Sequence, residues 1–328
     1  MVMMVNISEI IGINNLPVAN GLGEYAKRME VILKKNIVSY VMDKRKKDLD
    51  YAGNKVYGYF PPVTNGYMLN YFLSRIVLNK YYKGKYPHLL NPFYYLGSEY
   101  KYKSIVTIHD TYYKWRNEKL DKLYSKLIKK YSSFKNIISI SEQTANELIG
   151  EGYDRENITV MYHYIEPVFR KLDNIEKDGK TVITVGDGVL KNNVMVRNAI
   201  KEKYYHIHVG RDVEADENYF RVSNEELVKL YNRASVLIRL SDYEGFGYPP
   251  LEALFCGTPV VVSDIAIFRE LLNDSAVFVK KDKSCIVDGL EYAIQNREYI
   301  LKIFESKIKN RYTRETFIDK MNRYYESI

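Results

Sequence analysis

Residues 241–252 read SDYEGFGYPPLE, a turn rich in glycine and proline between an apolar strand pattern and a helical pattern. Two glycines let the backbone approach a ligand closely, and two prolines suit the first turn of a helix. The free N–H groups of that turn can bind an anion, and Glu244 and Glu252 can accept hydrogen bonds from sugar hydroxyls. The stretch therefore predicts a site for a nucleotide diphosphate that carries hydroxyl-bearing groups. The alternative is a tight loop with two solvated glutamates.

Strand and helix patterns alternate on both sides of a polar, charged segment at residues 166–180. This alternation predicts the α/β class, with two domains that each contain a parallel sheet. We expect a first domain at 1–165, a linker at 166–180, a second domain at 181–310, and a helix at 311–328 that packs back on the first domain. Ligands of such sheets bind at the carboxyl ends of the strands, so the cleft between two domains is the expected site.

Composition narrows the function class. The 328 residues carry a net charge of +8, with both signs mixed, which is typical of a soluble globular protein. Two cysteines exclude a disulfide framework and a four-thiolate zinc site. The start lacks a signal-peptide pattern and no apolar run is long enough to span a membrane, so we expect a cytoplasmic protein. Basic and aromatic residues at 67–86 leave peripheral contact with a membrane surface as an alternative.

The stretch continues as ALFCGTPVVVSDIAIFREL to residue 271 and follows EELVKLYNRASVLIRLS, and this whole segment resembles the signature of retaining glycosyltransferase family 4. Further resemblances occur in the family's order at SIVTIHD (104–110), IISISEQTANELI (137–149), VITVGDGVLKNN (182–193) and Gly21-Leu22-Gly23. The resemblance implies the GT-B fold, in which two Rossmann-like domains face each other across a cleft. It also implies transfer of a hexose from a nucleotide-diphospho-sugar to an acceptor hydroxyl with retention of configuration, without a metal or cofactor. The implied partners are the donor and a glycan, lipid-linked or protein acceptor.

The resemblance also implies residue roles. His109 is expected beside the reacting sugar, Glu244 on the donor sugar hydroxyls, and Lys191 on the leaving diphosphate, so these three are the expected catalytic residues. Glu252 is expected to hold the ribose hydroxyls, and Gly23 is expected to bring a backbone N–H to the diphosphate. The residues expected to bind the nucleotide sugar are Gly23, Gly186, Lys191, Arg211, Glu244, Gly245, Phe246, Gly247, Tyr248 and Glu252.

Position 187 is one of several departures from the family's pattern. Asp187 stands where the family usually has an arginine that neutralises phosphate, and Arg211 is a candidate replacement. A lysine, backbone N–H groups and a helix N-terminus can together stabilise the charge that develops on a leaving diphosphate, which is the role a metal ion plays elsewhere.

Other interpretations remain open. A GT-B nucleotide-sugar epimerase would share the same donor site. The pattern at 21–26 with Asp43 has the shape of a dinucleotide fingerprint, although the segment between strand and glycines is too long for its tight turn. The basic excess could serve nucleic acid, but the basic residues are scattered and form no recognised module. His206 and His208 share one side of a strand with no evident third ligand, so no metal site is predicted.

Overall fold

The computed structural model describes residues 7–16, 21–41, 48–57, 80–93, 96–111, 119–173 and 175–328. Asp43 and most of the basic segment 67–86 lie outside these ranges. The chain forms two compact units. Unit 1 is Met1–His163 with Phe317–Ile328, and unit 2 is Tyr164–Thr316.

Unit 1 contains a parallel sheet of seven strands in the order β3-β2-β1-β4-β5-β6-β7. The strands are β1 (Ile10–Asn14), β2 (Ile37–Val41), β3 (Asn54–Tyr57), β4 (Tyr86–Leu89), β5 (Ile105–Ile108), β6 (Ile137–Ser139) and β7 (Ile158–Val160). Their apolar runs are buried along the whole length of β1, β2 and β5, as expected for strands covered by helices on both faces.

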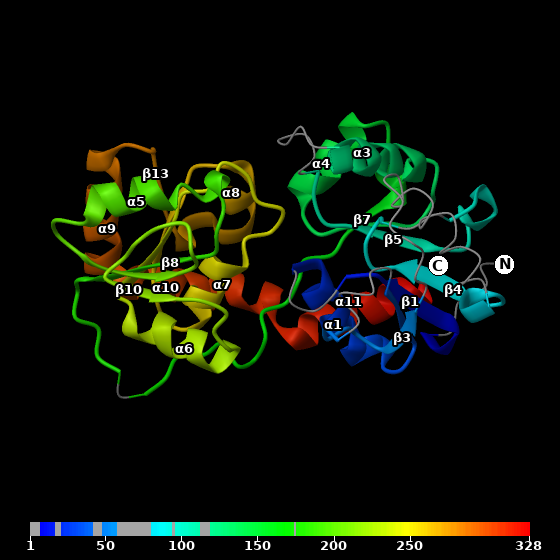
Figure 1. Ribbon diagram of the computed structural model, residues 1–328, viewed down its shortest axis with the longest axis horizontal. Helices are drawn as coiled ribbons and strands as arrows, with labels where there is room; N and C mark the ends of the chain where they lie inside the picture. The colour runs from blue at the N-terminus through cyan, green and yellow to red at the C-terminus, as the bar shows by residue number, and fades with distance from the viewer. Residues whose placement is uncertain are drawn as a thin grey trace. The chain divides into compact units, whose positions relative to one another are not determined.

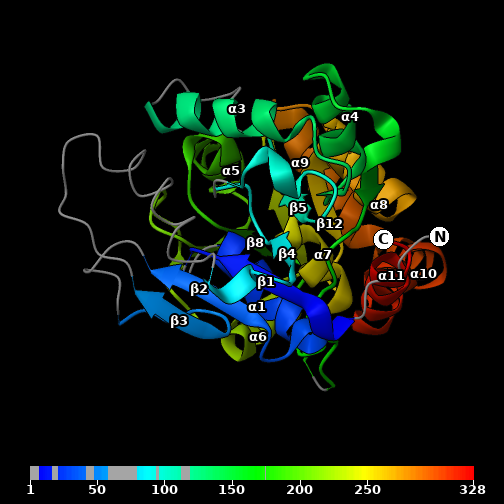
Figure 2. The same ribbon diagram turned by 90° about the vertical axis from the view of Figure 1, so that its right-hand side faces the viewer.

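The helices of unit 1 cover both faces of this sheet. Within the described residues they are α1 (Gly21–Leu33), α3 (Lys119–Tyr131), α4 (Glu142–Gly150) and most of α11 (Arg314–Glu326). Figures 1 and 2 both show α3 and α4 on one side of the strands and α1 on the other. Helix α4 begins with a capping side chain, because Ser141 Oγ accepts the N–H of Thr144 at 3.0 Å. Helix α11 joins the unit through Tyr325, whose hydroxyl lies 2.8 Å from Nδ1 of His88 in β4.

Unit 2 contains a parallel sheet of six strands in the order β10-β9-β8-β11-β12-β13. The strands are β8 (Thr181–Val185), β9 (Tyr205–Val209), β10 (Glu217–Tyr219), β11 (Val236–Arg239), β12 (Val260–Ser263) and β13 (Val277–Val279). The chain runs outward from β8 to β10 and then returns to the other side of β8 with β11. Strands β8 and β11 therefore flank the point where the strand order reverses, which is where open parallel sheets bind ligands.

Helices cover unit 2 on both faces. They are α5 (Asn193–Ile200), α6 (Asn224–Arg233), α7 (Tyr248–Phe255), α8 (Ala266–Leu272), α9 (Lys283–Gln295) and α10 (Arg297–Ile303). Figure 1 shows α5 and α9 on one face of the sheet and α6 on the other. The predicted α/β class with two parallel-sheet domains is confirmed.

The polar segment 166–180 is tied to unit 2 by hydrogen bonds. Lys177 Nζ donates to the carbonyl of Asn232 at 2.7 Å and to Thr258 Oγ1 at 2.8 Å. Asp178 accepts the N–H of Thr181 at 2.8 Å, at the start of β8. The lysine thus reaches the carbonyls at the C-terminal end of α6, where a cation is favourable.

Candidate active site

The candidate site of unit 2 lies at the carboxyl ends of β8 and β11. Lys191 closes a short turn of 3-10 helix, Val189–Lys191, in the loop after β8. Arg239 is the last residue of β11, and Glu244 lies in the loop that follows. Because β8 and β11 are neighbours in the sheet, these three side chains meet although they are far apart in the sequence.

Two cations share the Glu244 carboxylate. Lys191 Nζ lies 2.7 Å from Oε1, and Nε and Nη2 of Arg239 each lie 2.8 Å from the same oxygen. Ser241 Oγ also donates to Oε1, at 2.6 Å. Arg239 Nη1 donates to the carbonyl of Val185, at the end of β8. The contacts from Lys191, Arg239 and Ser241 to Glu244 all end on Oε1, and none of them involves the other carboxylate oxygen, Oε2.

The electrostatics of this cluster hold the carboxylate ionised. Burial alone disfavours the charged form of Glu244, but Arg239 and then Lys191 outweigh it and lower the pKa of Glu244 to about 2. The cluster therefore combines one negative and two positive charges at neutral pH, a net positive charge with the guanidinium only 6% exposed. Such a cluster can stabilise an anion that comes to the ends of these strands.

The loops after β8 and β11 are joined to each other. Asn192 Nδ2 donates to the carbonyl of Leu240 at 2.7 Å and to Asp242 Oδ2 at 3.1 Å. The N–H of Asp242 donates back to the carbonyl of Leu190 at 2.9 Å. Gly186 has φ of +89°, and a Cβ there would lie 3.3 Å from Arg239 Nη1, so the glycine lets the backbone run close to the guanidinium. These contacts fix Lys191 beside the end of β11.

The turn that opens helix α7 is packed tightly. Gly247 caps the helix with φ of +95°, and a Cβ there would lie 2.8 Å from Phe268 Cε1. Phe246 is buried against Tyr248 and Tyr312, with ring centroids 5.2 and 5.9 Å apart. Gly245 connects this turn to Glu244 in the chain. The predicted turn between strand and helix is present, and its first helical residues begin directly after Gly247.

Glu252 is a buried residue of α7 rather than a solvated one. Its side chain belongs to a residue only 7% exposed, and its Oε2 accepts the hydroxyl of Tyr231 at 2.9 Å. Burial, and then the Glu252 carboxylate, raise the pKa of Tyr231 well above its usual value, so the phenol stays protonated and keeps donating. The alternative of two solvated glutamates does not describe this turn, because both carboxylates are largely buried.

His109 and Gly23 belong to unit 1. His109 follows β5 and is buried, with Nε2 donating to the carbonyl of Leu90 at 2.8 Å. Burial lowers the pKa of His109 to about 4, so the ring is neutral at pH 7. Its ring lies 4.7 Å from that of Tyr25 and 5.4 Å from that of His163. Gly23 is a buried residue in the first turn of α1.

Arg239 was not expected from the sequence, whereas Arg211 was. The Arg211 guanidinium lies 3.3 Å from the centroid of the Phe220 ring, and its backbone N–H donates to Asp187 Oδ1. Arg239 supplies the cation that contacts Glu244 together with Lys191. The available signal was an arginine at the end of the apolar run VLIRL, directly before the Gly-rich turn.

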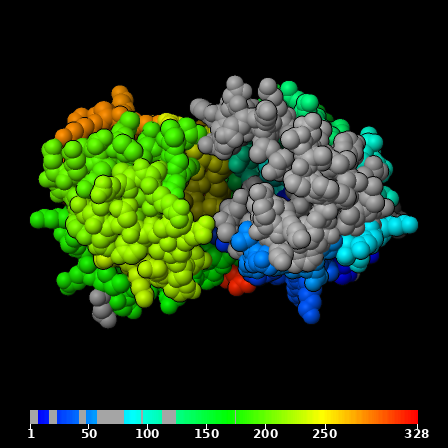
Figure 3. Space-filling model, viewed as in Figure 1, coloured from blue at the N-terminus to red at the C-terminus, as the bar shows by residue number. Residues whose placement is uncertain are grey.

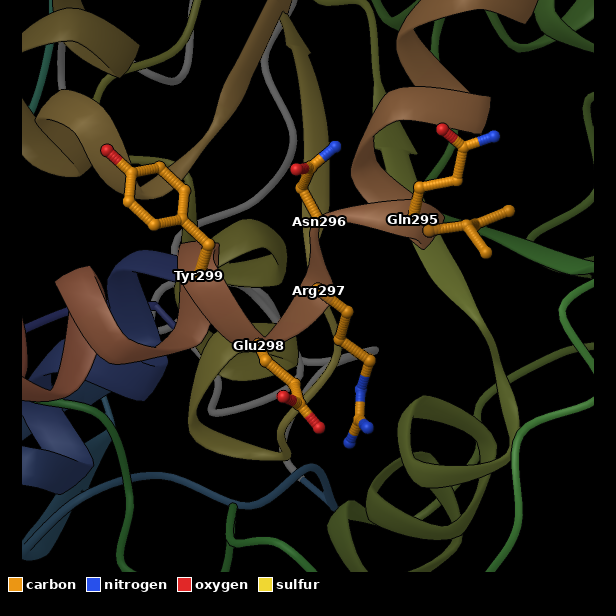
Figure 4. A pocket seen from close by; sticks show the side chains of 6 residues that line it. Gln295, Asn296, Arg297, Glu298 and Tyr299 are labelled. Atoms are coloured by element: carbon orange, nitrogen blue, oxygen red, sulfur yellow. The ribbon is translucent and has the colours of Figure 1, made fainter.

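A separate pocket lies at the junction of α9 and α10, away from these residues. It is lined by six consecutive residues, of which Figure 4 labels Gln295 to Tyr299. Its Arg297 is engaged in the fold, because Nε and Nη2 donate to the carbonyl of Gly257 at 3.2 and 3.1 Å. No predicted site residue lines this pocket.

Comparison with known families supports the resemblance. Residues 217–311 match the model of the glycosyl transferases group 1, and residues 38–168 match that of Glycosyltransferase Family 4. The two matches fall in the same order as the two sheets, and together they span more than half of the chain. The chain belongs to the glycosyltransferase family that these two models describe, glycosyl transferases group 1 and Glycosyltransferase Family 4.

Curated relatives share part of the chain. The O-antigen chain mannosyltransferase RfbU of Salmonella typhimurium is 29% identical over an alignment of 222 residues, and the match covers 60% of this chain and 61% of RfbU. The O-antigen biosynthesis glycosyltransferase WclY of Escherichia coli is 29% identical over 147 residues, 44% of this chain and 38% of WclY. The matched regions thus span about three fifths or less of the length of these relatives.

Solved structures share the fold over nearly the whole chain. Anabaena HepE, in complex with UDP and glucose, superposes with a TM-score of 0.76 at 11% identity, covering 97% of this glycosyltransferase and 99% of HepE. The lipopolysaccharide glycosyltransferase WaaG superposes with a TM-score of 0.72 at 12% identity, covering 95% and 99%. The predicted GT-B fold is therefore confirmed. Within the described residues, no helix is both long and apolar enough to cross a membrane.

Proposed function

We propose that this glycosyltransferase moves a hexose from a nucleotide-diphospho-sugar to a hydroxyl of a glycan acceptor, with retention of anomeric configuration. The observation that carries the proposal is the cluster of Lys191 and Arg239 on Glu244, at the carboxyl ends of β8 and β11. A nucleotide diphosphate offers the anion that this cluster would stabilise. Mannose is the first donor sugar to test, because the curated relatives include O-antigen mannosyltransferases.

The proposed reaction breaks the bond between the anomeric carbon and the diphosphate oxygen. The bonding electrons leave with the diphosphate, and the acceptor oxygen forms the new bond on the same face of the sugar. The acceptor proton passes to the leaving phosphate oxygen. Lys191 and Arg239 stabilise the charge that builds on the diphosphate, so the proposal requires no metal ion bound to it.

The carboxylates have separate proposed roles. Glu244 uses Oε1 for the two cations and Ser241, and its other oxygen accepts a donor sugar hydroxyl. Glu252 holds the ribose hydroxyls, with Tyr231 fixing the orientation of its carboxylate. His109, neutral and bound to Leu90, contributes from unit 1 to the transfer step. The predicted cytoplasmic location and the predicted lack of a cofactor stay predictions.

The donor can be found with the purified chain. UDP-, GDP- and ADP-sugars are screened by thermal shift, because a ligand that binds the folded state raises Tm. The chosen donor is then incubated with glycan acceptors, and the anomeric configuration of the product is read by NMR. An inverted product refutes retention, and a changed donor sugar without acceptor favours the epimerase. The transfer rate should not depend on added Mg²⁺.

A further inference from the structure

Three potential metal ligands gather at the carboxyl ends of β8 and β9. Asp187 follows β8, His208 lies in β9, and Asp212 follows β9. The two strands pair in parallel with Thr184 opposite His208, so their following loops meet at the same edge of the sheet. His208 Nε2 lies 2.9 Å from Asp212 Oδ1 and 3.7 Å from Asp187 Oδ1. This part of the chain is green to yellow-green in Figure 3, where residues of those colours cover the face of unit 2 that is turned to the viewer.

The histidine nitrogen that faces the two carboxylates lacks a hydrogen bond. His208 is fully buried, and among the described residues its Nε2 finds no partner with hydrogen-bond geometry, although Asp212 is near. Its other nitrogen, Nδ1, lies 2.8 Å from Thr184 Oγ1, which fixes the ring. A histidine that binds a metal through one nitrogen has the other nitrogen held in this way.

Donors outside this group of three residues also form hydrogen bonds to the two carboxylates. Asp187 Oδ1 accepts the N–H of Arg211 at 2.5 Å. Asp212 accepts the N–H of Gly188 at 2.9 Å and Nδ2 of Asn193 at 3.1 Å. Such outer hydrogen bonds orient the first ligands of a metal and leave further lone pairs of the carboxylates available.

A glycine keeps the centre of this cluster open. A Cβ at Gly210 would lie 2.3 Å from both Asp187 Oδ1 and His208 Nε2, so no larger residue fits there without displacing them. Two donor atoms that each bind a metal at about 2.1 Å lie about 3 to 3.5 Å apart at the usual bond angles. The 2.9 and 3.7 Å separations of His208 Nε2 from the two carboxylates match that spacing with small side-chain rotations.

We propose that Asp187, His208 and Asp212 bind one divalent transition-metal ion, which joins the loop after β8 to the loop after β9. One imidazole and two carboxylates suit Zn²⁺, Co²⁺ or Mn²⁺ better than Mg²⁺, which prefers oxygen ligands only. The two carboxylates give the cluster a net negative charge that a divalent cation would neutralise. The ion's role is to hold the Gly186–Gly188 loop, and the diphosphate keeps Lys191 and Arg239 as its cations.

His206 is not a ligand in this proposal. Its Nε2 lies 2.8 Å from Thr184 Oγ1, the same hydroxyl that His208 Nδ1 contacts. The sequence places both histidines on one side of β9 but does not reveal Asp187 and Asp212 as partners. The two carboxylate ligands come from the loops after the neighbouring strands β8 and β9.

The test measures metal binding to the whole chain without any donor. After treatment with a chelator and desalting, the protein is titrated with Co²⁺ by visible absorption, and with Zn²⁺ and Mg²⁺ by calorimetry. We expect one Co²⁺ or Zn²⁺ per chain, bound at least tenfold more tightly than Mg²⁺. Because no nucleotide sugar is present, failure of this proposal is distinguishable from failure of the proposed transferase reaction.

Three variants locate the ion. Asp187→Asn and Asp212→Asn should each weaken Zn²⁺ binding at least tenfold. Asp216→Asn is the matched control and should stay within twofold, because Asp216 pairs with Arg197 instead. Asp187 is exposed, so Asp187→Asn should leave the fold intact. This variant therefore still locates the ion where Asp212→Asn disturbs the hydrogen bond from Asn193. No saturable binding at millimolar Zn²⁺, or equal binding by wild type and Asp187→Asn, would overturn the proposal.

Discussion

Replacing Arg239 by methionine tests the electrostatic design of the site. Arg239→Met keeps the aliphatic stem but leaves Lys191 as the one cationic partner of Glu244 among the described residues. Removing one partner of a buried ion pair costs about 3–5 kcal/mol, and the remaining lysine places the expected loss at the lower end, about 3 kcal/mol at pH 7. The carbonyl of Val185 also loses its donor.

The pH dependence of this loss has a definite sign. In the wild type the pKa of Glu244 falls from 4.5 to about 2 on folding, which corresponds to roughly 3 kcal/mol of stability. That contribution is fully present above pH 4.5 and disappears as pH falls toward 2. In Arg239→Met the pKa of Glu244 should rise, because burial is opposed by one cation only. The variant should therefore lose more stability at pH 7 than at pH 4, where its carboxyl is partly protonated.

Urea unfolding of the whole chain measures both effects. Hydrogen exchange of peptides from unit 2 reports the unfolding of that unit. Arg239→Met in a Glu244→Gln background should cost only about 1 kcal/mol, the value of the lost bond to Val185. Arg269→Met is the matched control, because its pair with Asp264 is more than half exposed and should contribute little to stability. If Arg239→Met lost equal stability with and without the Glu244 carboxylate, or if the loss did not change with pH, the ion pair would not be its source.

Three further predictions concern His109, the acid stability of unit 1, and the turn before α7. His109→Ala should lower kcat more than donor affinity in steady-state kinetics and calorimetry; equal losses would count against a role in the transfer step. Burial lowers the pKa of His88 to about 3 and of His109 to about 4, so folding excludes protons that the unfolded chain binds. Unit 1 should therefore lose stability as pH falls from 6.5 toward 4, and a flat stability profile in urea melts would contradict this. Gly247→Ala should destabilise unit 2 by about 1–3 kcal/mol, because of its positive φ and the approach to Phe268. Gly150→Ala is its control, since an added Cβ in α4 meets nothing within 4 Å and should be neutral or stabilising in the same melts.

The sequence predicts the regular parts of the fold because they are written as local patterns. Apolar runs such as Ile105–Ile108 and Thr181–Val185 are buried strands, and Ser141 caps α4 as its residue type favours. The short strands β3, β4 and β10 cannot be predicted from local patterns of this kind. Strand β4 contains Pro87 and β10 is polar, so their place in the sheet depends on pairing with neighbours rather than on their own composition.

The site was predictable where its residues are close in the chain. Glu244, Gly247 and Glu252 share one turn and one helix, and Lys191 follows a recognisable strand. Arg239 was missed because an arginine at the end of an apolar strand gains its partner only when β8 and β11 pair. The cluster around His208 was missed for the same reason, since its carboxylates come from two different loops.

In the proposed reaction, Lys191 and Arg239 hold the diphosphate of the donor. Calorimetry that compares UDP with UMP, and GDP with GMP, isolates the second phosphate. The diphosphate that fits should bind at least tenfold more tightly than its monophosphate, and Lys191→Met should remove that difference. Lys283→Met, which alters an exposed lysine on α9, should preserve it. Equal affinity for mono- and diphosphate in the wild type, or an unchanged difference in Lys191→Met, would contradict the account.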